Sequence, residues 1–191
     1  MDNRIEFIRQ WYSRGENSKD EFDRFIFLWL CMVCIAKYWY SQSRKLDRNY
    51  DEPLEDGTFI KKFYENDQNS KLIMDAIEDL PEFDQLAKRK SPSEEYIISY
   101  PGKEEGLFKD LYMHKCFGTV MTIKNQSKAI GIALRAITNN LFHGGKLYES
   151  SADKNLLKLA TPILKIILLK AANEIMHIDL NRSIKDESDK V

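Results

Sequence analysis

The chain has 191 residues, with 29 Lys or Arg against 30 Asp or Glu, a formal net charge of −1, and 43% hydrophobic residues. This profile is typical of a soluble globular protein with room for one well-packed domain. The near-zero charge excludes proteins that hold nucleic acid by bulk positive charge, although a local basic patch remains compatible with it. Three cysteines are too few for a secreted disulfide scaffold. We therefore expect a cytoplasmic protein without a signal peptide, a membrane partner or a cofactor.

The N-terminal part predicts two helices in succession. Apolar residues at spacings of three and four indicate an amphipathic helix over 2–13, and Gly15 is placed to end it. A second helix is expected over 22–43, where neither Gly nor Pro occurs. Ser18 and Glu21 have the spacing of a capping box at its start.

The most apolar run, 25–36, lies inside this second helix and is 12 residues long. It is too short to span a bilayer, which takes about 20 residues, and it predicts a helix buried on more than one side. Cys31 and Cys34 lie within it as small core residues. A zinc site would need two more ligands, and His114 with Cys116 is the other candidate cluster. We expect no metal site.

The middle of the chain has a less regular pattern. Short helical stripes are expected over 57–66, 70–80, 81–89 and 104–117, and an irregular connection is expected over 90–103.

A stronger helical pattern resumes at Asn125 and ends at the pair 144–145, which is Gly-Gly. Its apolar stripe consists of Ile130, Leu134, Ile137 and Leu141. A last, strongly apolar helix is expected over 152–180. We assign 1–182 to a single all-α domain, an antiparallel helical bundle, and 183–191 to a frayed tail with almost nothing to bury.

The stretch with the most chemical information is 135–146. At about 100° per residue, Arg135 and Asn139 lie on the side opposite the apolar stripe, with His143 less central. The dipole at a helix C-terminus favours protonated His143, and Arg135 is placed to pair with a phosphate. The simpler interpretation is a solvated helix face with a histidine at its end.

The run 139–146, Asn-Asn-Leu-Phe-His-Gly-Gly-Lys, followed by 153–157 and a long apolar helix, resembles the end of a HEPN domain. This helical family is common in prokaryotic defence and toxin systems. The aromatic start of the earlier apolar helix, 25–30, resembles the corresponding helix in several branches of the family. The resemblance implies a helical bundle that dimerises. In active members, an Arg and a His form a composite site at the dimer interface that cleaves RNA without metal.

Three roles follow from this resemblance. His143 from each of two protomers would act as acid and base on a ribose hydroxyl and a phosphodiester. Arg135 would stabilise the charge that develops on the phosphate oxygens, and Asn139 would position a phosphate or the imidazole.

The sequence departs from the family pattern at Thr138, where the motif Arg would fall. The cationic role then passes to Arg135 or Lys146, and we expect Asn140, Lys146 and Thr138 to contact RNA. The basic runs 44–48 and 88–90 form a second candidate edge for RNA.

Two functions remain open. The first is a HEPN-like, metal-independent endoribonuclease with its composite site at a homodimer interface, favoured by the retained run 139–145. The alternative is a catalytically degenerate HEPN-like binding module whose partner is an antitoxin or defence component, favoured by Thr138. The sequence leaves the role of 45–105 unassigned.

Overall fold

The structure, a computed structural model, describes residues 3–46, 56–88, 105–142 and 151–181. Every regular element in these ranges is an α-helix, which confirms the predicted all-α fold. The helices are α1 (Asn3–Asn17), α2 (Glu21–Leu46), α3 (Asp56–Glu65), α4 (Asp67–Ile77), α5 (Pro81–Ala87), α7 (Glu105–Phe117), α8 (Ile123–Phe142) and α9 (Ser151–Met176).

Three sequence expectations cannot be compared with these helices. The irregular connection at 90–103, the glycine pair at 144–145 and the tail at 183–191 lie outside the described residues.

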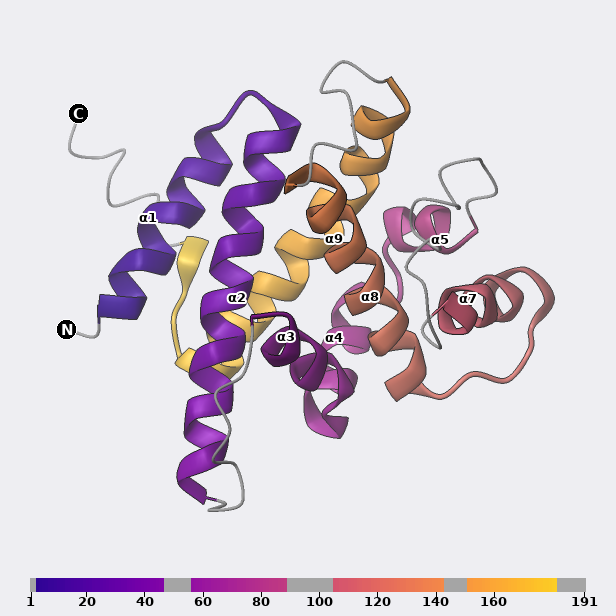
Figure 1. The fold of residues 1–191 in the computed structure, drawn as a ribbon, viewed down its shortest axis with the longest axis horizontal. Coiled ribbons are helices and arrows are strands. Elements are labelled where there is room, and N and C mark those ends of the chain that lie inside the picture. The colour runs from indigo at the N-terminus through magenta and orange to yellow at the C-terminus, as the bar shows by residue number, and fades with distance from the viewer. Residues whose placement is uncertain (1–2, 47–55, 89–104, 143–150, 182–191) are drawn as a thin grey trace.

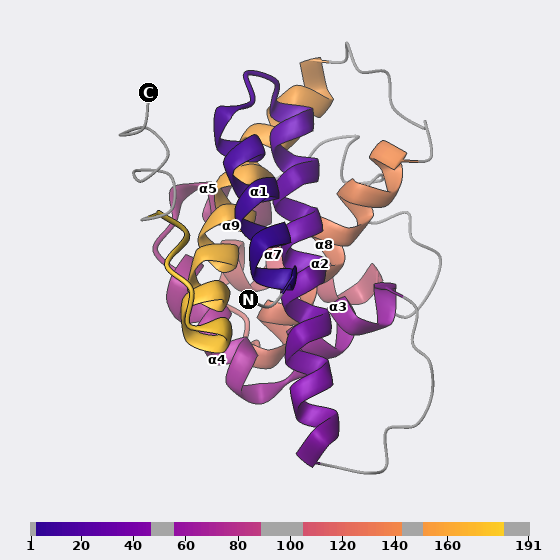
Figure 2. The same ribbon diagram turned by 90° about the vertical axis from the view of Figure 1, so that its left-hand side faces the viewer.

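The helices pack around α2 and α9, which cross in contact with each other (Figures 1 and 2). Helix α1 covers one side of α2, and α4 and α5 cover α9. Helix α8 packs against α3, α4 and α7, so that α4 joins it to the α9 side of the core. None of the helices that the structure describes is long and apolar enough to cross a membrane.

The expected buried run in α2 is confirmed. Its buried apolar side chains are Phe25, Leu28, Trp29, Cys31, Met32, Ile35 and Ala36. Helix α9 contributes a second continuous set, Leu156, Leu157, Ala160, Ile163, Leu164, Ile167, Leu168, Ala171 and Ala172. Helices that are apolar on more than one side need neighbours on several sides, and this explains why α2 and α9 form the centre of the bundle.

Gly15 does not end the first helix, which corrects the expectation from sequence. Helix α1 continues to Asn17, and Gly15 is buried inside it. A Cβ atom at Gly15 would lie 3.4 Å from the Cβ of Phe27 and 3.5 Å from Leu28 Cδ2. The glycine therefore marks a close contact between α1 and α2 rather than a helix stop.

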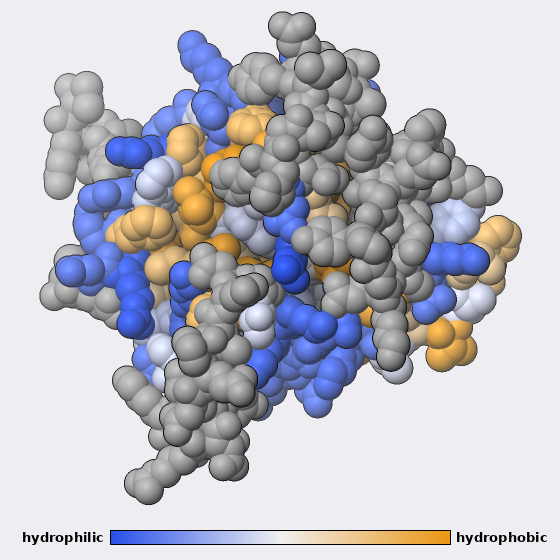
Figure 3. Space-filling model, viewed as in Figure 1, coloured by the Kyte–Doolittle hydropathy of each residue, from blue (hydrophilic) through white to orange (hydrophobic). Residues whose placement is uncertain are grey.

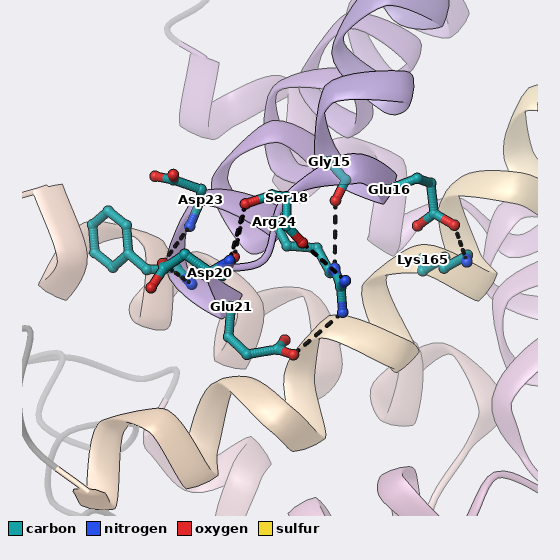
Figure 4. Close-up of polar contacts among 9 residues, drawn as sticks. Gly15, Glu16, Ser18, Asp20, Glu21, Asp23, Arg24 and Lys165 are labelled. Atoms are coloured by element: carbon teal, nitrogen blue, oxygen red, sulfur yellow. Dashed lines mark hydrogen bonds and ion pairs between the residues drawn. The ribbon is translucent and has the colours of Figure 1, made fainter. Parts of the chain in front are cut away.

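The predicted capping box at the start of α2 is also wrong, because Asp20 caps this helix (Figure 4). The Oδ1 of Asp20 accepts the backbone N–H groups of Phe22 at 2.8 Å and Asp23 at 3.1 Å. The Oγ of Ser18 instead accepts the N–H of Asp20 at 3.2 Å and donates to its carbonyl at 3.1 Å. Ser18 thus shapes the turn that presents the capping carboxylate.

Arg24 holds the α1–α2 turn from inside the second helix (Figure 4). Its guanidinium donates to the carbonyl oxygens of Ser18 at 3.0 Å and Gly15 at 3.4 Å, and it pairs with Glu21 at 3.2 Å. Glu21 is therefore a partner of Arg24 and not a member of a capping box.

The last helix ends at Met176, four residues before the predicted end at Leu180. His177 has a φ of 56°, in the left-handed region. The N–H of His177 donates to Asn173 O, and the next N–H, of Ile178, donates to Ala172 O, both at 3.1 Å. The chain leaves the helix at a histidine, where a glycine is usual, so no glycine marks the end of α9 in the sequence.

We expect Asp20→Ala to lower the free energy of unfolding by about 1 kcal/mol, because two N–H groups of α2 lose their acceptor. Urea denaturation followed by circular dichroism measures this difference. Asp23→Ala, at an exposed position in the same turn, is the matched control. An equal loss in both variants would contradict the assignment of Asp20 as the cap.

We expect His177→Gly to raise the free energy of unfolding by up to about 1 kcal/mol, because glycine adopts a positive φ without the steric cost that other L-residues incur. Thermal denaturation measures the change, with His177→Ala as the control that keeps the Cβ atom. A His177→Gly protein no more stable than His177→Ala would contradict the left-handed conformation.

Candidate nucleic-acid interface

Helix α8 carries the candidate site and has two distinct faces. As predicted, Ile130, Leu134 and Ile137 of the apolar stripe are buried, whereas Leu141 at its end is half-buried. A second face is half-buried and consists of Lys128, Ile132, Arg135 and Asn139. These residues recur at intervals of four, three and four, so they lie along one side of the helix. We call this set the α8 face.

The structure brings Arg135 and Asn139 together on the α8 face, one turn apart. Both side chains remain partly accessible, and each has an interaction within the protein that a ligand would have to share or displace.

Thr138 does not share this face. Its side chain is buried, with 3% of its surface exposed, and its hydroxyl donates to the carbonyl oxygen of Leu134 at 2.9 Å. Almost none of the Thr138 side chain is therefore accessible for the RNA contact that the sequence predicted. Threonine fits the position because its hydroxyl is satisfied within the helix itself.

Three other predicted site residues cannot be placed. His143 and Lys146 lie outside the described residues. Asn140 belongs to α8, but its side chain also lies outside the described part of the structure.

A shallow hollow opens between α8 and α3, beside the α8 face. It is lined by Ile60, Lys61, Tyr64, Lys128, Gly131, Ile132 and Arg135. Its floor is apolar, from Ile60 and Ile132, and three cationic side chains belong to its lining, one from α3 and two from α8. The hollow is too small to enclose a ligand, so an anionic ligand would lie across it and contact the cations at its edge.

The hollow exists because α3 approaches α8 at a glycine. A Cβ atom at Gly131 would lie 2.5 Å from the Cγ of Tyr64 and 2.9 Å from its Cβ. No side chain fits there without movement of the Tyr64 ring. Tyr64 is fully buried, and burial raises the pKa of its phenol.

Hydrogen bonds fix the end of α3 in this position. The backbone oxygen of Tyr64 accepts the hydroxyl groups of Ser70 at 2.9 Å and of Ser127 at 3.1 Å. The Nδ2 of Asn69 donates to the carbonyl of Phe63 at 3.2 Å. These buried side chains satisfy carbonyls that a helix C-terminus leaves without partners, and they join α3 and α4 to α8.

Ion pairs support the same junction at the surface. Lys128 pairs with Glu65 at 2.6 Å, and Lys124 pairs with Asp67 at 3.0 Å. Because these pairs are partly or largely exposed, each contributes little to stability, at most about 1 kcal/mol. Their main effect is to orient the lysines of α8.

A long stretch of the chain is free of acidic residues although it contains no basic run. Between Asp110 and Glu149 the chain has five Lys or Arg and no acidic residue. Since the whole chain has a formal charge of −1, the remainder carries −6. Four of these cations are spread along α7 and α8, and Lys146 lies outside the described residues. Of the two basic runs considered earlier, Lys88 pairs with Asp84 at 2.7 Å, and the other side chains lie outside the described residues.

The cysteines and histidines that the structure describes form no second site. Cys31 is buried, its Sγ lies 3.5 Å from the carbonyl oxygen of Ile8, and burial raises the pKa of its thiol. Within the described ranges, no group of three or more His, Cys, Asp or Glu is arranged to hold a metal ion.

Comparison with known proteins adds no relative: no protein-family model, no curated protein and no solved structure matches the chain.

We expect Gly131→Ala to lower the free energy of unfolding by about 1–3 kcal/mol through overpacking against Tyr64, although alanine favours a helix by about 1 kcal/mol over glycine. Gly15→Ala is the matched control, because its added Cβ meets no atom closer than 3.4 Å, and we expect it to be far less destabilising. Chemical denaturation compares the two. A Gly131→Ala protein as stable as the wild type would contradict the tight α3–α8 contact.

Proposed function

We propose that this chain is a HEPN-like protein that acts on RNA through the α8 face. One observation carries the proposal: a stretch of the chain without acidic residues supplies Lys128 and Arg135 to a hollow that also contains Lys61 of α3. Nucleic acid is the polyanion that such an arrangement suits, because phosphates pair with Lys and Arg and displace counterions.

The geometry favours an extended polyanion over a single phosphate. Lys128 and Arg135 are seven residues apart, about 10 Å along the helix axis. A series of phosphates suits two cations at that separation, and it would have to displace Glu65 from Lys128. Ile60 and Ile132 between them offer a bound strand a shallow apolar contact rather than an enclosing pocket.

In the catalytic form of the proposal, the protein is a metal-independent endoribonuclease and a homodimer supplies the composite site. His143 of one protomer takes the proton from a ribose 2′-hydroxyl, and His143 of its partner protonates the leaving oxygen. Arg135 stabilises the charge on the phosphate oxygens, and Asn139 orients the phosphate or the imidazole.

The second candidate is a degenerate HEPN-like module that binds RNA or a partner protein without cleaving RNA. Burial of Thr138 favours it, because the position at which the motif Arg would fall points into the protein. A catalytic protein would have to rely on Arg135, which is the one described cation in the second half of α8.

Cleavage of a mixed RNA pool in excess EDTA separates these candidates. We expect the wild type to leave cyclic phosphate ends, and His143→Ala and Arg135→Ala to lower the rate about a hundredfold or more. Lys158→Ala removes an exposed cation of α9 and should leave the rate unchanged.

Filter binding at several salt concentrations supplies the second measurement. We expect Arg135→Ala to weaken RNA binding and to reduce the slope of log Kd against log salt by about one. Binding without cleavage would identify the degenerate module. Absence of both, in a folded wild-type protein, would refute an action on RNA.

A further inference from the structure

A cavity lies between α2 and the junction of α3 with α4, and it shares no lining residue with the hollow beside the α8 face. Its lining consists of Trp39, Tyr40, Ser43, Lys62, Glu65 and Asn66. Its volume is about 260 Å³, just below the range of about 300–1,000 Å³ that is typical of small-molecule sites. The cavity therefore suits a ligand with one ring system.

The aromatic side of the cavity is held in place by packing against buried rings. Trp39 contacts the buried ring of Phe63 at a nearly perpendicular angle, with centroids 5.5 Å apart. Tyr40 makes a similar contact with Phe59 at 5.2 Å. Tyr40 is buried, whereas Trp39 is half-buried. The indole of Trp39 therefore offers a fixed and partly accessible surface to a planar ring.

Two polar side chains of the lining are oriented by contacts within the protein. The Oδ1 of Asn66 accepts the N–H groups of Gln68 and Asn69, both at 3.1 Å, so its Nδ2 keeps N–H donors for a ligand. The Oε1 of Glu65 pairs with Lys128 at 2.6 Å. Because each carboxylate oxygen accepts more than one hydrogen bond, Glu65 can bind a ligand without leaving Lys128.

Charges of both signs line the cavity and disfavour a charged ligand. The Nζ of Lys62 lies 5.3 Å from the centroid of the Tyr40 ring, so a cation already occupies that ring and would repel a second one. An anionic group would meet the carboxylate of Glu65. A neutral, planar group that has both donors and acceptors avoids these conflicts, and a nucleobase is such a group.

The surface around the cavity does not suit a protein partner. Figure 3 shows that the described surface over α3 and α4 is largely hydrophilic. Such a surface lacks the apolar core of a protein interface.

We propose that this cavity binds a guanine base, with the ring against Trp39, its N1–H and 2-amino groups donating to Glu65, and its O6 accepting from Asn66. Guanine has two adjacent N–H donors beside a carbonyl, which matches a carboxylate next to an amide. Adenine and cytosine place an acceptor nitrogen in this edge, and uracil has a single N–H donor. The base belongs to a free guanine nucleotide or to an RNA strand, so the site does not depend on the action proposed for the α8 face.

Calorimetric titration of the full chain with guanosine, inosine and adenosine monophosphates tests the proposal. These nucleotides share the ribose and the phosphate, so differences in affinity report on the base. We expect saturable binding of guanosine monophosphate. Inosine monophosphate, which lacks the 2-amino group, should bind about tenfold more weakly, and adenosine monophosphate more weakly still.

Two variants locate the binding. Glu65→Gln should weaken binding of guanosine monophosphate about tenfold, because the base loses its charged acceptor. Glu174→Gln is the matched control, since Glu174 also pairs with a lysine, Lys170 at 3.5 Å on α9, and it should bind like the wild type. Ser43→Phe should abolish binding by filling the cavity, and circular dichroism verifies that each variant is folded.

An RNA oligonucleotide with one guanine, compared with the same oligonucleotide carrying inosine there, distinguishes the two sources of the base. Binding of the free nucleotide without a preference between the oligonucleotides assigns the cavity to a free guanine nucleotide. A preference for guanine that Glu65→Gln removes assigns it to RNA. The proposal fails if neither the nucleotides nor the oligonucleotides show a preference for guanine, or if Glu65→Gln and Glu174→Gln bind alike. RNA binding that Arg135→Ala weakens and Glu65→Gln does not would support the α8 face and overturn the cavity as an RNA site.

Discussion

The contact between the Tyr64 ring and the backbone of α8 at Gly131 is the constraint on which the candidate site depends. Because Gly131 has no side chain, the ring packs directly on the helix, and Ser70 and Ser127 then reach the carbonyl of Tyr64. The Tyr64 hydroxyl is left buried without a partner, at a cost of about 1–3 kcal/mol. Burial of the ring and satisfaction of the helix end must offset that cost. Lys61, on the same helix, consequently lies beside the cations of α8.

Helix α8 has one side that packs against neighbouring helices and another side that is partly accessible. Buried side chains hold it among α3, α4 and α7, and between 127 and 138 the partly accessible residues are Lys128, Ile132 and Arg135 of the α8 face. Thr138 belongs to the packed side, where its hydroxyl is used within the helix. An Arg at that position would have to displace neighbours or leave a charge buried, which is costly without a partner. Arg135, one turn earlier, is the described cation of α8 nearest in sequence to this position.

The parts of this structure that sequence predicted are those governed by local periodicity. The apolar run in α2, the stripe of α8 and the short helices before α7 follow from spacing alone. Gly15 was misread because a glycine at a helix crossing has the same local signature as one at a helix end. The end of α9 was missed because a histidine takes the left-handed position.

The hollow could not be predicted, because Lys61 and Arg135, which both line it, are far apart in the sequence. The position of Arg135 and Asn139 on one side of α8 was predicted, but His143 and Lys146 are not described, so their place in the site remains a prediction.

The near-zero net charge conceals a separation of charge along the chain. Five cations without an acidic residue between Asp110 and Glu149 are balanced by an excess of acid elsewhere. The dipole of α8 adds positive potential at its N-terminus and negative potential at its C-terminus. Toward Phe142, side chains must therefore overcome the helix if an anion is to bind. Arg135 supplies a permanent charge there, and in the proposed function this charge offsets the dipole at a phosphate.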